Sequence, residues 1–296
     1  MRAILSFALA VVFAWSLAPP EAAAAARLQV IATTTDIQAL VISIAGDKVD
    51  VQSLAAPTQD PHSLELKPSQ LERLRSASLV VRIGLDHEPW LARVQIQAPT
   101  LNLSENVRLL QTETPRLRVE RQSHVHAFGN PHYWLDPENA KAMAISIARA
   151  LGQLLPADRP YFDGNRDKFI NQIDQHMLVW NKVLAPYAGT RIVVVHDTWT
   201  YFADRFKLSI AAAAEATPGV PPSPAELARL YSRMREAKVR LVVADPNSRD
   251  SLVRQIAEHG NARVVSLIPS VGADPAARDY LSLMDLNVDR IIKALR

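Results

Sequence analysis

The sequence has 296 residues, of which 48% are hydrophobic and 21% charged, with no cysteine and a formal net charge of +3. This composition indicates a globular protein of one large or two medium domains, whose stability comes from a buried core and not from disulfides. The small net charge and the lack of a basic block argue against nucleic-acid binding.

Residues 1–26 are predicted to be a secretory signal peptide. Arg2 supplies a positive charge, residues 3–18 form an apolar run, and the alanines at 22–26 offer small side chains for cleavage. The apolar run is short for a membrane span. Because no cysteine is present to carry a lipid, we expect the mature chain to be released into the periplasm.

The first half of the mature chain alternates strands with helices, which predicts a mainly parallel sheet flanked by helices. Asp36 is expected to cap the first helix, which Gly46 ends, and Pro68-Ser69 opens the second. The polar stretch from Ser104 to Pro131 is predicted to be a long surface loop. Strands are expected at residues 27–33, 49–54, 78–83 and 100–103.

A helix capped by Asp136, with Pro137 at its first position, is predicted to reach about Leu155. Residues 158–184 then show apolar side chains at helical spacing, which predicts a helix on the order of 40 Å long that joins two lobes. A second α/β set follows, with a last helix expected over 274–296. We therefore predict an α/β fold with an N-terminal lobe (27–157), a rigid linking helix (158–186) and a C-terminal lobe (187–296).

Three of the eight histidines occupy positions that suit a binding site. His62 follows the end of a strand, His196 directly follows the strand 191–195, and His132 stands just before the Asp136 helix. Ligands of open α/β sheets bind outside the carboxyl ends of the strands. These histidines are therefore expected to converge in a cleft between the lobes, although a lone histidine beside aromatic residues is more often a packed core residue.

The segments 60–69 (DPHSLELKPS), 130–137 (NPHYWLDP) and 195–202 (VHDTWTYF) occur in this order. Together they resemble the three ligand motifs of the periplasmic zinc- and manganese-binding proteins of ABC transporters, the cluster A-I or cluster 9 family. The resemblance extends over the mature chain. It implies two lobes, a linking helix, a metal bound between the lobes and delivery of that metal to an inner-membrane permease.

Carried over residue by residue, the resemblance assigns His62, His132 and His196 as metal ligands. Many relatives place an aspartate after the last strand, but residues 266–272 (SLIPSVG) contain no carboxylate. Glu215, at a strand end, is our predicted fourth ligand, with a surface or loop-supporting role as its alternative. Asp274 and water are the other candidates for the fourth position.

The predicted ligand set favours Zn²⁺, because three neutral imidazoles and one carboxylate suit a tetrahedral site. Mn²⁺, which prefers more oxygen ligands, is the alternative metal. Each histidine must lose its proton to bind, so zinc affinity is expected to fall below about pH 6.

Three further histidines have weaker claims. His124 and His126 lie in the long loop, where they could capture zinc or could be ordinary loop residues. His87 lies in the segment 85–90 (LDHEPW), which with Glu88 and Trp90 resembles another family element lining the first lobe. His87 could contact the metal ligands without binding the metal itself.

The interpretation that results is a monomeric binding protein that carries zinc to an ABC permease and is not an enzyme. A zinc hydrolase is one rival, since three histidines with an open position could activate water. However, the chain lacks a His-Glu-x-x-His motif. A binder of organic ligands on the same architecture is a second rival.

Overall fold

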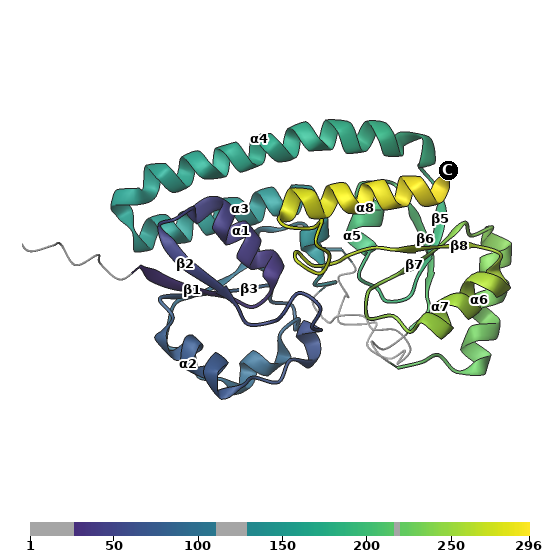
Figure 1. Ribbon diagram of the computed structural model, residues 1–296, viewed down its shortest axis with the longest axis horizontal. Coiled ribbons are helices and arrows are strands. Elements are labelled where there is room, and N and C mark those ends of the chain that lie inside the picture. Colours follow the sequence, from purple (N-terminus) through teal and green to yellow (C-terminus); the bar gives the residue numbers. More distant parts are fainter. Residues whose placement is uncertain (1–26, 111–128, 216–219) are drawn as a thin grey trace, which may run out of the picture.

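The computed structural model describes residues 27–110, 129–215 and 220–296. Two four-stranded sheets form two lobes, and every strand pairing in both sheets is parallel (Figure 1). The predicted fold of two parallel-sheet lobes is therefore confirmed. The first sheet has the order β2-β1-β3-β4 and the second the order β6-β5-β7-β8, so the two lobes share one topology. The strands are β1 (Leu28–Ala32), β2 (Val49–Ser53), β3 (Leu79–Arg82), β4 (Thr100–Asn102), β5 (Arg191–Val194), β6 (Ser209–Ala213), β7 (Leu241–Ala244) and β8 (Arg263–Ser266).

Helices cover the sheets, which is why the central strands are largely apolar. All four residues of β7 are buried, for example, as are the first three of β3. The α-helices are α1 (Thr35–Ala45), α2 (Pro68–Ser76), α3 (Pro137–Leu154), α4 (Arg159–Leu184), α5 (Thr200–Arg205), α6 (Pro224–Ala237), α7 (Asp250–Gly260) and α8 (Tyr280–Leu295).

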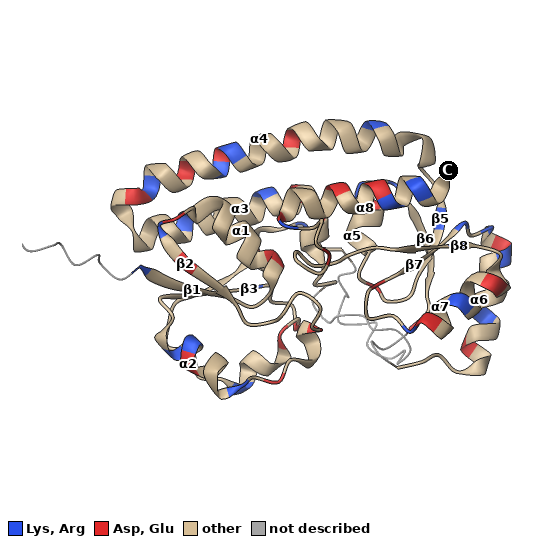
Figure 2. Ribbon diagram, in the orientation of Figure 1, with Lys and Arg blue, Asp and Glu red and all other residues tan. Residues whose placement is uncertain are grey.

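Helix α4 follows the first sheet in the chain and precedes the second. Its 26 residues give a length of about 39 Å, and it extends alongside both lobes (Figure 1). Basic and acidic side chains are intermixed along its outer face (Figure 2), and Leu178 and Val179 are exposed in its second half. Within the three described stretches, no helix combines the length and the apolarity that a membrane span requires. The buried face of α4 carries Phe162, Phe169, Ile173, Met177, Trp180 and Leu184.

Two sequence predictions about helix starts are wrong. Thr34, not Asp36, caps α1 by accepting a hydrogen bond from the Ile37 N–H, and Asp36 lies in the first turn with its carboxylate turned into the protein. The last helix begins at Tyr280 instead of Asp274, because Asp279 and Ser282 form a reciprocal capping box there.

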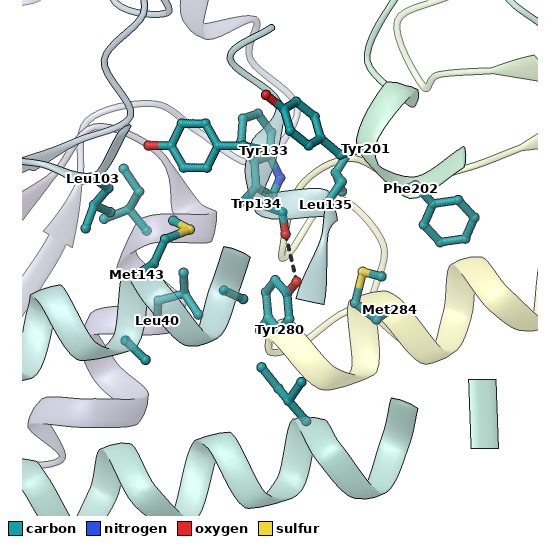
Figure 3. Packing of buried hydrophobic residues seen from close by; sticks show 14 of the residues in the cluster. Leu40, Leu103, Tyr133, Trp134, Leu135, Met143, Tyr201, Phe202, Tyr280 and Met284 are labelled. Carbon is teal, nitrogen blue, oxygen red and sulfur yellow. Dashed lines mark hydrogen bonds between the residues drawn. The ribbon is translucent and has the colours of Figure 1, made fainter. Parts of the chain in front are cut away.

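One buried hydrophobic core extends through both lobes and the helices that join them. Its centre contains aromatic residues from distant parts of the chain, among them Tyr133, Trp134, Tyr201 and Tyr280 (Figure 3). Two of their hydroxyl groups tie the histidine-bearing segment 130–134 in place. The hydroxyl of Tyr201 donates to the Asn130 carbonyl (2.8 Å) and that of Tyr280 to the Trp134 carbonyl (2.7 Å).

A paired carboxylate and guanidinium also join the lobes. Asp136, which caps α3 as predicted, accepts two hydrogen bonds from Arg205 at the end of α5, at 2.6 and 2.8 Å. The Asp136 side chain is 2% exposed and that of Arg205 is 24% exposed. A bidentate pair of this kind is strong, but it leaves a buried charge if one partner is removed.

We expect Arg205→Met to lower the free energy of unfolding by about 3 kcal/mol, because the Asp136 carboxylate would stay buried without its cation. Chemical denaturation of the metal-free protein measures this. The double variant Asp136→Asn/Arg205→Met removes both charges and keeps a capping side chain, so it should recover at least half of the loss. A loss below about 1 kcal/mol in the single variant would mean that this pair contributes no more than an exposed one.

Candidate metal site

A cavity of about 240 Å³ lies between the lobes, where the carboxyl ends of the strands of both sheets meet. Its wall includes His62 and His132 from the first lobe and His196, Glu215 and Asp245 from the second. The cavity is large enough for a small ion and its ligands.

His62 is held by the backbone around it. It lies in a 3₁₀ turn (Pro61–Ser63) in which its N–H donates to the carboxylate of Asp60 at 2.9 Å. The indole N–H of Trp90 donates to the Pro61 carbonyl at 2.8 Å. These bonds fix the position of a loop residue whose side chain is half-buried.

His132 is the most buried of the three predicted ligands, at 4% exposed. Its Nδ1 lies 2.9 Å from Oδ1 of Asn130, which also accepts the His132 N–H. The Asn130 amide nitrogen donates to the carbonyl of Asp197 (2.8 Å), so its oxygen is the acceptor. Because an amide oxygen only accepts, Nδ1 carries the ring proton and Nε2 keeps the lone pair that a metal requires.

We expect Asn130→Ala to weaken zinc binding by about 10- to 100-fold, since the amide orients His132 and connects it to the segment of His196. Competition with a chromogenic chelator measures the change. Asn165→Ala is the control, because it removes a side-chain amide on α4 that donates to the Ile44 carbonyl on α1. Equal affinities of the two variants would show that Asn130 does not support the site.

His196 follows β5 and Val195, at the carboxyl end of an inner strand of the second sheet. It lines the cavity between the lobes. Val195 continues the sheet through an N–H bond to the Val243 carbonyl at 2.9 Å. Three residues later, the indole N–H of Trp199 donates to Asp245 at 2.6 Å. The strand end and this bond fix the turn that carries His196.

The structure brings His62, His132 and His196 together, with one ligand nitrogen from each lying within 4.8 Å of the others. The ring centroids of His132 and His196 are 5.5 Å apart, and those of His62 and His132 are 5.8 Å apart. Three imidazoles from two lobes can therefore face a single ion. Neutral imidazole nitrogen is a ligand for Zn²⁺, Cu²⁺, Ni²⁺ and Fe²⁺.

Glu215 lies in the wall of the same cavity, 9% exposed, outside this group of three histidines. Its N–H donates to the Val195 carbonyl, which places its backbone beside the His196 turn. Asp245, directly after β7, also lines the cavity, and the sequence analysis did not single it out. Burial raises the pKa of Asp245 to about 7, and the negative charge of Glu215 adds to this rise. Its position after a strand, like that of His196, is the signal that could have identified it.

The other residues that the sequence analysis considered as ligands or supporting residues differ in whether they line the cavity. Asp274 accepts the Ala276 N–H and pairs with Arg290 (2.6 Å), and these contacts lower the pKa of its carboxyl group. It does not line the cavity. His87 does line the cavity, with 1% of its surface exposed. His124 and His126 lie outside the described residues.

The fold is that of two-lobed proteins in which one long helix joins the lobes. A solved structure of a Cd-bound periplasmic metal-binding protein from Candidatus Liberibacter asiaticus has this fold. It superposes with a TM-score of 0.78 and 19% identity, covering 91% of this chain and all of that one.

The family model for ZnuA, the periplasmic component A of the zinc-uptake complex, matches residues 30–294. The chain belongs to this family. Among curated relatives, the high-affinity zinc uptake system protein ZnuA of Yersinia pestis is 28% identical over 78% of this chain and 79% of its own length. The manganese ABC transporter substrate-binding lipoprotein PsaA of Streptococcus pneumoniae is 24% identical over 91% and 89%.

Proposed function

We propose that this protein is a periplasmic solute-binding component that captures Zn²⁺ between its lobes and delivers it to an inner-membrane ABC permease. The observation that supports this most directly is the convergence of His62, His132 and His196, contributed by both lobes, within 4.8 Å in one cavity. Membership of the zinc-uptake family supports delivery to a transporter.

Zinc is the proposed metal for two independent reasons. Nitrogen-rich ligand sets suit Zn²⁺ better than Mn²⁺, which prefers carboxylate and water oxygens. The matching family model and the Yersinia relative are also named for zinc uptake. Manganese is the second candidate, because the streptococcal relative is named for manganese transport.

Glu215 is our proposed fourth ligand. It is buried in the cavity wall on the same lobe as His196, and its negative charge would offset part of the charge of a buried divalent ion. Asp274 is a poorer candidate because Arg290 already binds it. Water would complete the site if Glu215 does not reach the ion.

The proposal includes three further expectations of the sequence analysis. Residues 1–26 act as a cleaved signal peptide, and the mature protein is a monomer with lobes at 27–157 and 187–296 around the linking helix. The cavity binds and releases the metal unchanged, so the proposal assigns no catalytic residue.

The first test is anomalous X-ray scattering at the zinc edge, on crystals of the mature chain loaded with one equivalent of zinc. We expect a peak within bonding distance of His62, His132 and His196, and its remaining neighbour will identify the fourth ligand. The absence of a peak at these histidines would overturn the proposed site.

A growth experiment separates the two metals. A strain lacking this protein should fail under zinc chelation and recover when the wild-type gene is restored. Recovery only under manganese limitation would make manganese the transported metal.

A further inference from the structure

His87 brings a fourth imidazole to the cavity, and the predicted site leaves it unused. Its ring centroid lies 4.5 Å from that of His62 and 5.5 Å from that of His132, and its side chain is 1% exposed. Trp134 packs against both His87 and His132, with ring centroids 5.3 Å apart in each case. Three of the four cavity imidazoles therefore belong to the first lobe.

The backbone before His87 adopts an unusual conformation that places this residue in the cavity. Gly84, Leu85 and Asp86 have φ values of 82°, 55° and 57° in succession. A left-handed conformation at leucine is costly, and such strain persists where the surroundings specify it strongly, often at functional sites.

The surroundings that specify this turn can be identified. The buried carboxylate of Glu88 accepts the N–H groups of Ile83 (2.7 Å) and Gly84 (3.0 Å). It also accepts the hydroxyl of Thr33 at 2.6 Å, while the His87 N–H donates to the Gly84 carbonyl at 3.0 Å. The position of His87 is therefore fixed from both sides.

The separations of the three ring centroids are close to those of imidazoles that share one ion, although His87 is outside the group of histidines whose ligand nitrogens lie within 4.8 Å of one another. With zinc–nitrogen bonds of about 2.0 to 2.1 Å in a tetrahedral array, the centroids of two imidazoles that bind one ion lie about 5 Å apart. The three separations among His62, His87 and His132 are 4.5, 5.5 and 5.8 Å. The His62–His87 separation is shorter than the expected value, and the other two separations are longer.

We propose that His62, His87 and His132 form a second position for Zn²⁺, carried by the first lobe alone. This inference rests on the proposed function, because it shares His62 and His132 with the interlobe site. A histidine offers one lone pair to a metal, so only one of the two positions is occupied at a time. The ion moves between them by exchanging a single ligand, His196 for His87.

The arrangement gives the ion a path with few broken bonds. His62 and His132 stay bound to the ion while the third imidazole is replaced. The ion therefore moves to or from the second lobe without dissociating from the protein. The carboxylates of Glu215 and Asp245 line the cavity from the second lobe and favour the interlobe position in the loaded protein. The first-lobe position then serves capture and release.

The test uses the full mature chain and zinc alone. His196→Ala removes the interlobe site, and we expect it to retain zinc with an affinity about 100-fold below that of the wild type. An anomalous zinc peak in crystals of this variant should lie within bonding distance of His87, His62 and His132. This measurement leaves His87 intact, so it does not depend on how a variant of His87 folds.

His87→Phe supplies the second measurement, because phenylalanine keeps a ring against Trp134. In the His196→Ala background we expect it to lower zinc affinity at least about tenfold further. A zinc peak away from His87 in the His196→Ala crystals would overturn the proposal. Equal zinc affinities of His196→Ala and of the double variant His87→Phe/His196→Ala would do the same. Failure of the wild-type protein to bind zinc at His196 would instead overturn the proposed function.

Discussion

Replacing His132 with alanine is expected to weaken zinc binding by at least about 100-fold, more than the 10- to 100-fold that loss of a supporting residue costs. His132 is the ring that connects the others. Its centroid lies within 5.8 Å of those of His62, His87 and His196, while Asn130 fixes its proton on the side away from the lone pair. Without it, the interlobe site keeps one histidine on each lobe.

The measurement is a competition titration against a chelator of known affinity, at about pH 7.5 so that the imidazoles are neutral. His259→Ala is the matched control. This histidine stacks on Tyr231 on the second lobe and does not line the cavity, so its loss should leave zinc affinity unchanged. A His132→Ala protein that binds within about threefold of the wild type would exclude His132 as a ligand.

The second large effect is on stability, and it depends on pH through Asp36. This carboxylate is buried against the second lobe, where it accepts the Val271 N–H at 2.9 Å. Burial raises the pKa of Asp36 from 3.8 to about 7, and its hydrogen bonds offset only part of the rise. In the unfolded chain the same group ionises near its ordinary value.

The sign of the effect follows from these two values. Between about pH 4 and pH 7 the folded protein keeps a proton that the unfolded chain has lost, so stability falls as pH rises. Three pKa units correspond to about 4 kcal/mol. The loss is complete above the folded pKa and absent below the unfolded one.

Asp36→Asn isolates this contribution, because asparagine keeps an oxygen for the Val271 N–H but does not ionise. In metal-free protein we expect the variant to match the wild type near pH 4 and to exceed its unfolding free energy by up to about 4 kcal/mol near pH 8. Denaturant titrations across this range measure the difference. Asp47→Asn removes an exposed charge near the other end of α1 and is the control. A difference that does not change with pH would contradict the argument.

The sequence predicted most of the fold because its signals are local. Capping residues and strand patterns predicted both parallel sheets and the long helix. The strand-end rule pointed to His62 and His196, the helix start pointed to His132, and the three motifs of the family resemblance grouped them. The start of the last helix could also have been read from Asp279 and Ser282, whose capping box is a local pattern.

The errors and omissions concern residues whose roles depend on distant partners. Asp36 looked like a helix cap, but its carboxylate contacts Val271, which is 235 residues away. Asn130 supports His132 only because the fold places Asp197 behind it. The position of His87 in the cavity follows a turn with positive φ at Leu85, and leucine gives no sign of that conformation in a sequence.

The core that runs through both lobes has a consequence for transport under the proposed function. Swinging the lobes apart would expose part of that core, and each Å² of apolar surface exposed to water costs about 25 cal/mol. We therefore expect metal exchange to use local movements of the cavity loops, so that the empty and loaded proteins would keep nearly the same shape. A permease that recognises this shape would bind both forms, so empty protein would compete with loaded protein for docking. Uptake would then slow when empty carrier accumulates, even while metal remains.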